Sequence, residues 1–151
     1  MDRLKIYMDC CCFCRPFDDL SQQKVSFERE AVLSIINICE AGFWDIFKSD
    51  VLEDEINRIV NPVKRQKVIK LYSSANLNIE INDGIIDRSS KLTGASNLGA
   101  FDALHLASAE YGGASVLLTT DKKFYIRAVK SNTIIRIANP ALWLTEVLLN
   151  E

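Results

Sequence analysis

The sequence predicts an α/β fold, a three-layer α/β/α sandwich around a central, mostly parallel sheet of four to five strands. Short apolar runs alternate along the whole chain with longer segments whose apolar residues recur near the helical period. This alternation is typical of units in which right-handed crossovers place helices on both faces of a sheet. With 151 residues, 48% of them hydrophobic, the chain can bury one sizeable core, so we expect a single domain over residues 1–151.

The first third of the chain is expected to contain two strands and one long helix. Residues 4–8 predict a buried strand, and residues 10–21 a loop. Residues 22–40 predict a helix, because their apolar side chains follow the 3.6-residue period and Gly42 stands just past the end. Residues 43–47 predict the second strand.

The middle third is expected to contain three helices and one strand. Residues 49–59 predict a helix that a serine or an aspartate can cap. Residues 61–74 predict another, because Asn61-Pro62 is the usual cap-then-proline start. Residues 77–81 alternate apolar and polar side chains as a strand does, and residues 82–94 predict a helix closed by a glycine.

The last third is expected to contain three helices and two strands. After a loop of small residues, residues 100–111 predict a helix that a pair of glycines ends. A strand at 115–120 leads into a helix at 121–130. A final strand at 133–137 precedes a helix that begins with Asn139-Pro140.

Charge and hydropathy exclude several classes of protein. The net charge is −2, so no global basic field indicates nucleic-acid binding. We interpret two local basic clusters as solvated helix faces: Lys64, Arg65, Lys67 and Lys70, and Lys122, Lys123, Arg127 and Lys130. No apolar run approaches the ~20 residues that span a bilayer, and the first residues lack the apolar stretch of a signal peptide. We therefore expect a cytoplasmic protein with no membrane partner.

Five cysteines are interpreted as free thiols in a reducing compartment. Four of them crowd into Cys10-Cys11-Cys12-Phe13-Cys14, leaving only Cys39 and one histidine elsewhere, which does not match the paired spacing of zinc sites. An odd number of cysteines also argues against a disulfide framework. We expect them to be small packed residues, with redox sensing as the alternative.

Four acidic residues are the candidate site residues: Asp9, Glu55, Asp102 and Asp121. Asp9 and Asp121 directly follow expected strands, and ligands of open parallel sheets bind at the carboxyl ends of the strands. Asp102 opens a helical run, and helix capping is the alternative role for each of the three aspartates. Glu55 is chosen because its spacing from nearby apolar residues turns it toward the buried side, and Glu53 is the fallback.

Carboxylates gathered at one site need a cation or protons. Two unit charges ~4 Å apart cost ~4 kcal/mol at an effective dielectric near 20, so four of them cannot all stay ionised unaided. Either some take protons, or a hard divalent ion such as Mg²⁺ or Mn²⁺ lies among the oxygens. The second arrangement is a hydrolytic metal site.

Four fragments of the chain stand in an order that matches a known family: Ile6-Tyr7-Met8-Asp9, residues 49–56, residues 102–107 and residues 117–124. This order resembles the PIN domain family of small, VapC-like, metal-dependent ribonucleases. The resemblance implies that Asp9, Glu55, Asp102 and Asp121 form a Mg²⁺ or Mn²⁺ site, with Thr119 as a nearby polar supporter. Cys10 and Cys11 depart from the family pattern, since many members have a threonine and then an asparagine or serine there.

The resemblance further implies an endoribonuclease that cleaves single-stranded RNA by means of a metal-activated water and leaves 5′-phosphate and 3′-hydroxyl ends. It also implies a toxin of a toxin–antitoxin pair, an antitoxin as protein partner, and a homodimer.

Two other classes of function stay open at this point. An aspartyl phosphotransfer domain, either receiver-like or a haloacid-dehalogenase-type phosphatase, also places an aspartate after a strand beside Mg²⁺. The phosphatase pattern requires a second aspartate where Cys11 stands, which argues against it. A noncatalytic binding module would keep the fold while its acids serve as helix caps.

Overall fold

Five parallel strands form one sheet in the order β3-β2-β1-β4-β5 in the computed structural model, which describes residues 3–150. The strands are β1 (Lys5–Met8), β2 (Asp45–Ser49), β3 (Leu77–Ile79), β4 (Val116–Leu118) and β5 (Ile137–Ala138). Each pairs in parallel with its neighbours. The predicted parallel sheet is therefore confirmed, and it has five strands.

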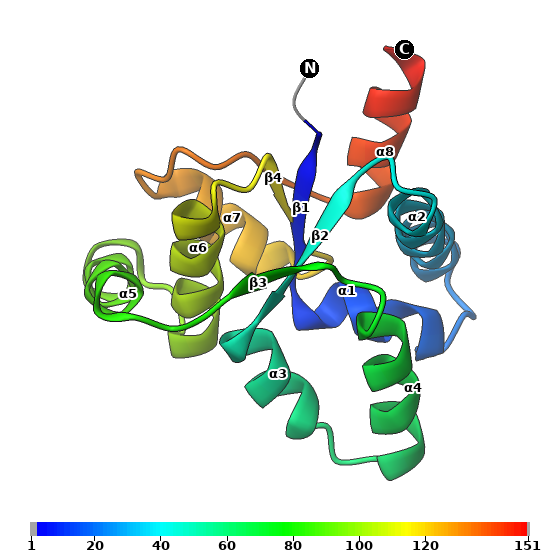
Figure 1. Cartoon of the computed structure of the whole chain (residues 1–151), viewed down its shortest axis with the longest axis horizontal. Coiled ribbons are helices and arrows are strands. Elements are labelled where there is room, and N and C mark those ends of the chain that lie inside the picture. Colours follow the sequence, from blue (N-terminus) through cyan, green and yellow to red (C-terminus); the bar gives the residue numbers. More distant parts are fainter. Residues whose placement is uncertain (1–2, 151) are drawn as a thin grey trace.

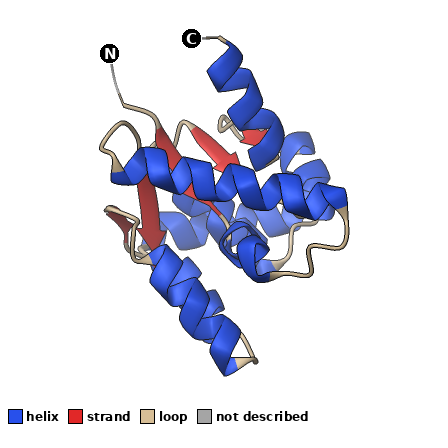
Figure 2. Ribbon diagram, turned by 90° about the vertical axis from the view of Figure 1, so that its right-hand side faces the viewer, coloured by secondary structure: helices blue, strands red, loops and turns tan. Residues whose placement is uncertain are grey.

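Helices cover both faces of this sheet, which confirms the predicted three-layer fold. The helices are α1 (Cys10–Cys14), α2 (Gln23–Glu40), α3 (Asp50–Asn57), α4 (Pro62–Tyr72), α5 (Asp83–Ser96), α6 (Ala100–Gly112), α7 (Lys122–Lys130) and α8 (Pro140–Leu149). Figure 1 shows α5, α6 and α7 on one side of the sheet and α2 and α8 on the other. From the side of α2, this long helix crosses in front of the strands (Figure 2). No helix among residues 3–150 is long and apolar enough to cross a membrane.

Side-chain caps begin several helices where the sequence predicts them. The Ser49 hydroxyl accepts the backbone N–H of Leu52 at 3.1 Å at the start of α3. The side-chain oxygens of Asn61 and Asn139 accept the first free N–H groups of α4 and α8, each directly before a proline. Each such cap typically contributes ~1 kcal/mol to stability.

The hydrophobic core is centred on β1. Ile6, Tyr7 and Met8 are fully buried, because β1 is the middle strand and has helices above and below it. On the side of α2, the indole rings of Trp44 and Trp143 meet edge to face with 5.2 Å between their centroids. This contact packs α8 against the chain that enters β2.

One expected loop is wrong. Residues 10–21 begin with α1 and continue in a 3₁₀ turn, η1 (Arg15–Phe17). Asp9 starts α1 by accepting the N–H of Cys12 at 3.2 Å. A helix of five residues is too short to show an apolar period. In the sequence Pro16 indicates a break, but in the structure it stands at the start of η1, where its missing N–H costs no hydrogen bond.

Other boundaries shift by a few residues. The second strand begins at Asp45 instead of at residue 43, and the fifth is reduced to two residues from the expected 133–137. The strand at 77–81 ends at Ile79, because the N–H of Ile81 turns to donate to the Asp50 carboxylate at 2.8 Å. The helix expected to close at residue 94 runs to Ser96, and Asn97, with φ of 57°, ends it.

The strand order places a crevice between the carboxyl ends of β1 and β4. The chain runs from β1 to β2 and β3 on one side and then returns to form β4 and β5 on the other. The connections after β1 and β4 therefore leave in opposite directions, which opens the usual ligand position of such sheets. Asp9 follows β1 directly, and its N–H donates to the carbonyl oxygen of Leu118 in β4 at 3.2 Å.

Candidate functional site

The four predicted acidic residues line one cavity of about 510 Å³ at this crevice, together with a fifth acid, Asp18, and we call it the acidic cavity. Asp9 comes from the end of β1, Glu55 from α3, Asp102 from the first turn of α6, and Asp121 from the residue before α7. The structure thus places all four predicted site residues on the same cavity. The parallel sheet brings them together, because the elements that carry them all begin at its carboxyl edge.

Asp9 is both a helix cap and a wall of the acidic cavity. It is 5% exposed, and its Oδ1 accepts the N–H of Cys12 at 3.2 Å and the thiol of Cys11 at 2.9 Å. Burial raises the pKa of Asp9 well above its ordinary value. Both of these bonds end on Oδ1. The capping role therefore leaves one carboxylate oxygen for the cavity.

Asp121 has the same double role at the start of α7. Its Oδ1 accepts the N–H groups of Lys123 at 2.9 Å and Phe124 at 3.2 Å. Thr119, which is 2% exposed, accepts the N–H of Asp121 at 3.0 Å, and its hydroxyl lies 3.5 Å from the sulfur of Cys11. Thr119 therefore links the turn that carries Asp121 to the helix that follows Asp9.

Asp102 lies in the first turn of α6 but is not its cap. Gly99 is the N-cap of α6, and the Asp102 carboxylate has no hydrogen bond or ion pair to any of residues 3–150. Burial raises the pKa of Asp102 to about 6, and the charges of Asp121 and Glu55 act in the same direction. Of the three aspartates it is the one for which helix capping fails as an explanation.

Glu55 is anchored by a buried histidine. Its Oε1 lies 3.0 Å from Nε2 of His105, a residue that is 1% exposed. Glu53, the fallback from the sequence, lines a different cavity beside Tyr72. One feature of the sequence points to His105: it follows Asp102 by three residues and so lies on the same side of α6.

A chain of hydrogen bonds continues from His105 into the core. Nδ1 of His105 lies 2.6 Å from the Tyr7 hydroxyl, which lies 2.8 Å from the Ser49 hydroxyl. The Glu55 carboxylate can only accept, so Nε2 of His105 carries a proton and donates to it, which leaves Nδ1 of the neutral ring as an acceptor. Burial raises the pKa of Tyr7, so its hydroxyl keeps its proton and can donate it to Nδ1. This arrangement fixes one tautomer and one direction for the Glu55 anchor.

Positive and aromatic side chains at the same cavity were not predicted as site residues. Lys64 donates to Asp18 at 2.9 Å, and Arg15 donates to the other oxygen of Asp18 at 3.0 Å, so this fifth acid is neutralised. The guanidinium of Arg58 lies 5.6 Å from the ring centroid of Phe101, and both line the cavity. The sequence shows Lys64 only as part of a basic helix face, without saying what that face meets.

The donor chemistry of the acidic cavity fits a hard divalent cation. As the side chains stand, no group of three or more Asp, Glu, Cys or His residues within 3–150 could hold a metal ion, so a cation would need the four carboxylates that line the cavity to move closer together. Their oxygens are the ligands that Mg²⁺ and Mn²⁺ prefer. The thiol of Cys11 donates a hydrogen bond to Asp9, and the sulfur atoms of Cys10 and Cys14 lie 3.8 Å from each other.

Comparison with known proteins agrees with this architecture. A family model described as "PIN domain" matches residues 23–130, more than two thirds of the chain. No curated protein matches the chain. Three solved structures have similar folds: a toxin-antitoxin complex from Klebsiella pneumoniae (19% identity, 89% of this chain and 97% of that one, TM-score 0.59), VapBC2 from Rickettsia felis bound to a DNA fragment from its promoter (11%, 90% and 98%, 0.59), and PAE2754 from Pyrobaculum aerophilum (16%, 97% and 96%, 0.58). At these identities the likeness shows the fold.

The raised pKa of Asp102 predicts a pH-dependent cost to folding. The folded-state pKa of about 6 lies above the ordinary 3.8, so the folded protein loses stability relative to Asp102→Asn as the pH rises through this interval. At pH 8, without divalent ions, we expect Asp102→Asn to be more stable than wild type by about 1–2 kcal/mol, after allowing for screening at a partly exposed group. At pH 4 the difference should vanish. Urea unfolding measures both, with the exposed Asp87→Asn as control.

The buried chain from Glu55 to Ser49 predicts a large effect at His105. His105→Phe keeps a ring but leaves the Tyr7 hydroxyl and the Glu55 carboxylate without their partner, so the free energy of unfolding should fall by ~2–4 kcal/mol. His105→Gln should lose less, because its amide offers both a donor and an acceptor. A loss below ~0.5 kcal/mol for His105→Phe, the range of neutral substitutions, would show that these contacts do not stabilise the fold.

Proposed function

The chain belongs to the PIN domain family, and we propose that it is a metal-dependent endoribonuclease that cleaves phosphodiester bonds of single-stranded RNA. The observation that carries the proposal is the convergence of four carboxylates on one cavity, two of which have raised pKa values. Bare, this cavity would repel a phosphodiester. Once Mg²⁺ or Mn²⁺ neutralises the carboxylates, the same place attracts one.

The acidic residues and His105 would have different roles at such a site. Asp9, Asp102 and Asp121 would hold the cation. Glu55 would complete the coordination shell of the cation or orient the attacking water. When bound, the cation supplies Lewis acidity, which lowers the pKa of water and stabilises the charge that develops on the phosphate. His105 holds Glu55 toward the cavity through its 3.0 Å contact. The expected products carry 5′-phosphate and 3′-hydroxyl ends.

Side chains at the rim supply the contacts to RNA. Lys64 and Arg58 are the two cations that line the acidic cavity, and Phe101 beside Arg58 offers an aromatic edge. Cations that follow the backbone and aromatic rings that meet unpaired bases are the usual means of binding single strands. This combination favours an unpaired substrate over a duplex, whose bases are already stacked.

The proposal extends to protein partners. One of the similar solved structures is a toxin–antitoxin complex, and we propose that this chain likewise has an antitoxin that blocks the acidic cavity, and that it acts as a homodimer. Light scattering tests the dimer, since the monomer has a mass of 17.0 kDa. Isolation from the native cell tests the antitoxin: cleavage should appear only after a small bound protein has been removed.

Cleavage of a pooled single-stranded RNA tests the proposed function. Wild type should cleave with Mg²⁺ or Mn²⁺ and stop when EDTA is added. Asp9→Asn, Asp102→Asn and Asp121→Asn should each lower the rate by about 100-fold or more, because the lost stabilisation is several kcal/mol and each ~1.4 kcal/mol is tenfold. Asparagine caps a helix as well as aspartate does, so the variants at positions 9 and 121 remove charge and keep the capped helices.

Asp87→Asn, on the exposed face of α5, is the matched control and should cleave like wild type. Two results would contradict the proposal. One is cleavage by the three Asp→Asn variants at the wild-type rate. The other is a wild-type protein that shows no divalent-dependent cleavage and binds neither ion. Acetyl phosphate separates the phosphotransfer alternative, because a covalent phosphoryl adduct on Asp9 would favour that function over hydrolysis of RNA.

A further inference from the structure

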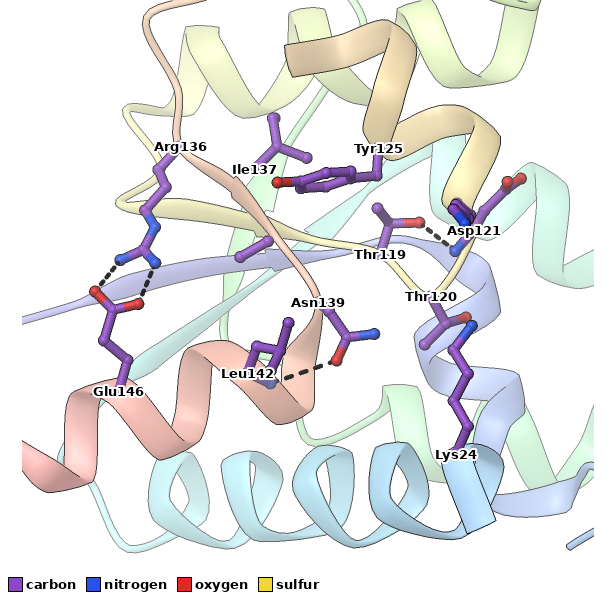
Figure 3. Close-up of a pocket in the computed structure, with 12 residues that line it drawn as sticks. Lys24, Thr119, Thr120, Asp121, Tyr125, Arg136, Ile137, Asn139, Leu142 and Glu146 are labelled. Carbon is purple, nitrogen blue, oxygen red and sulfur yellow. Dashed lines mark hydrogen bonds and ion pairs between the residues drawn. The ribbon is translucent and has the colours of Figure 1, made fainter. Parts of the chain in front are cut away.

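A second cavity of about 600 Å³ adjoins the acidic cavity on the far side of the chain between β4 and α7, and we call it the apolar cavity. Asp121 lines both cavities. Figure 3 shows Tyr125 extending from α7 and Leu142 from α8, on either side of β5. The two cavities therefore share Asp121 as part of one wall, and a ligand long enough to pass this residue would contact both.

The walls of the apolar cavity suit a flat, partly apolar group. Tyr125 is 40% exposed and Leu142 73% exposed, so both side chains are accessible, and Ile137 of β5 also lines the cavity. Exposed aromatic rings stack on unpaired nucleobases, with ~1–3 kcal/mol per base. A volume of this size accommodates a small organic ligand.

The charges of the apolar cavity favour an anion at the end next to Asp121. Lys24, from the start of α2, lines that end and is 61% exposed, with only a 3.9 Å contact to Glu28. In Figure 3 its side chain rises toward Thr120 and Asp121. Lys122 follows Asp121 directly and also lines the cavity. Two ammonium groups beside the shared wall complement a phosphate that runs from one cavity to the other.

Arg136 and Asn139, two further polar residues of the apolar cavity, already have partners. Arg136 donates both ends of its guanidinium to Glu146, which closes the far end. Asn139 accepts the N–H groups of Ala141 and Leu142 and donates to Glu28 at 2.6 Å. Neither side chain is therefore free to read the edge of a base, and stacking is the main contact that this end of the cavity offers.

We propose that the apolar cavity is a nucleoside subsite, in which one unpaired base of the RNA stacks against Tyr125 while the adjoining phosphate passes Lys24 and Lys122 toward the acidic cavity. The subsite rests on the proposed nuclease function, and it adds the place where a nucleotide next to the cleaved bond is held. An apolar peptide or a second copy of this chain is the competing occupant of such a surface, and the charge at the shared wall favours the polyanion.

Titration with adenosine 5′-monophosphate, followed by backbone amide NMR in the presence of EDTA, tests the subsite without any cleavage. The nucleotide should shift the amides of Thr120, Tyr125 and Ile137, and ribose 5-phosphate, which lacks the base, should bind at least about tenfold more weakly. Tyr125→Ala should weaken nucleotide binding about tenfold, whereas Tyr125→Phe, which keeps the ring, should retain it. Tyr111→Ala, at another exposed tyrosine outside both cavities, is the matched control.

Three outcomes would overturn the subsite: shifts confined to other surfaces, equal affinity of wild type and Tyr125→Ala, or a dimer that Leu142→Asp converts to monomer while the nucleotide fails to bind. The measurement also separates the two proposals. Nucleotide binding at this cavity by a protein that cleaves no RNA would refute the nuclease function alone. Divalent-dependent cleavage without binding here would refute the subsite alone.

Discussion

Burial of neighbouring carboxylates at the edge of the sheet is the constraint on which the site depends. The fold does not relieve it fully: burial raises the pKa of Asp9, and burial together with neighbouring acids raises that of Asp102. Backbone N–H groups of α1 and α7 stabilise one oxygen each of Asp9 and Asp121. Asp102 receives no such bond from residues 3–150. The remaining imbalance of charge is what a divalent cation would correct.

The support of the site lies deeper than the carboxylates. The contacts from Glu55 through His105 and Tyr7 to Ser49 join α3, α6, β1 and β2 by hydrogen bonds of 2.6 to 3.0 Å. Because Tyr7 and His105 are buried, each lost bond would leave a polar group without water. The same bonds that stabilise the core therefore also set the direction of Glu55.

The sequence predicts the layers and the four acids because both follow from local rules. A window of about ten residues around each position is enough to see that strands end at Asp9 and Asp121 and that apolar residues are spaced around Glu55. Contacts between residues that are distant in the sequence do not follow from such local patterns. His105 reaches Glu55 across fifty positions, and Lys64 and Phe101 reach the acidic cavity only through the angles at which α4 and α6 pack. The short helix α1 escaped prediction because five residues cannot display a period.

Anomalous diffraction from crystals grown with Mn²⁺ tests the central claim most directly. The account predicts a manganese peak within the acidic cavity, enclosed by carboxylate oxygens of Asp9, Asp102 and Asp121, and no peak there in crystals of a variant that lacks the Asp9 charge. Manganese found only at exposed acids elsewhere on the surface, with the acidic cavity empty at saturating concentration, would contradict it.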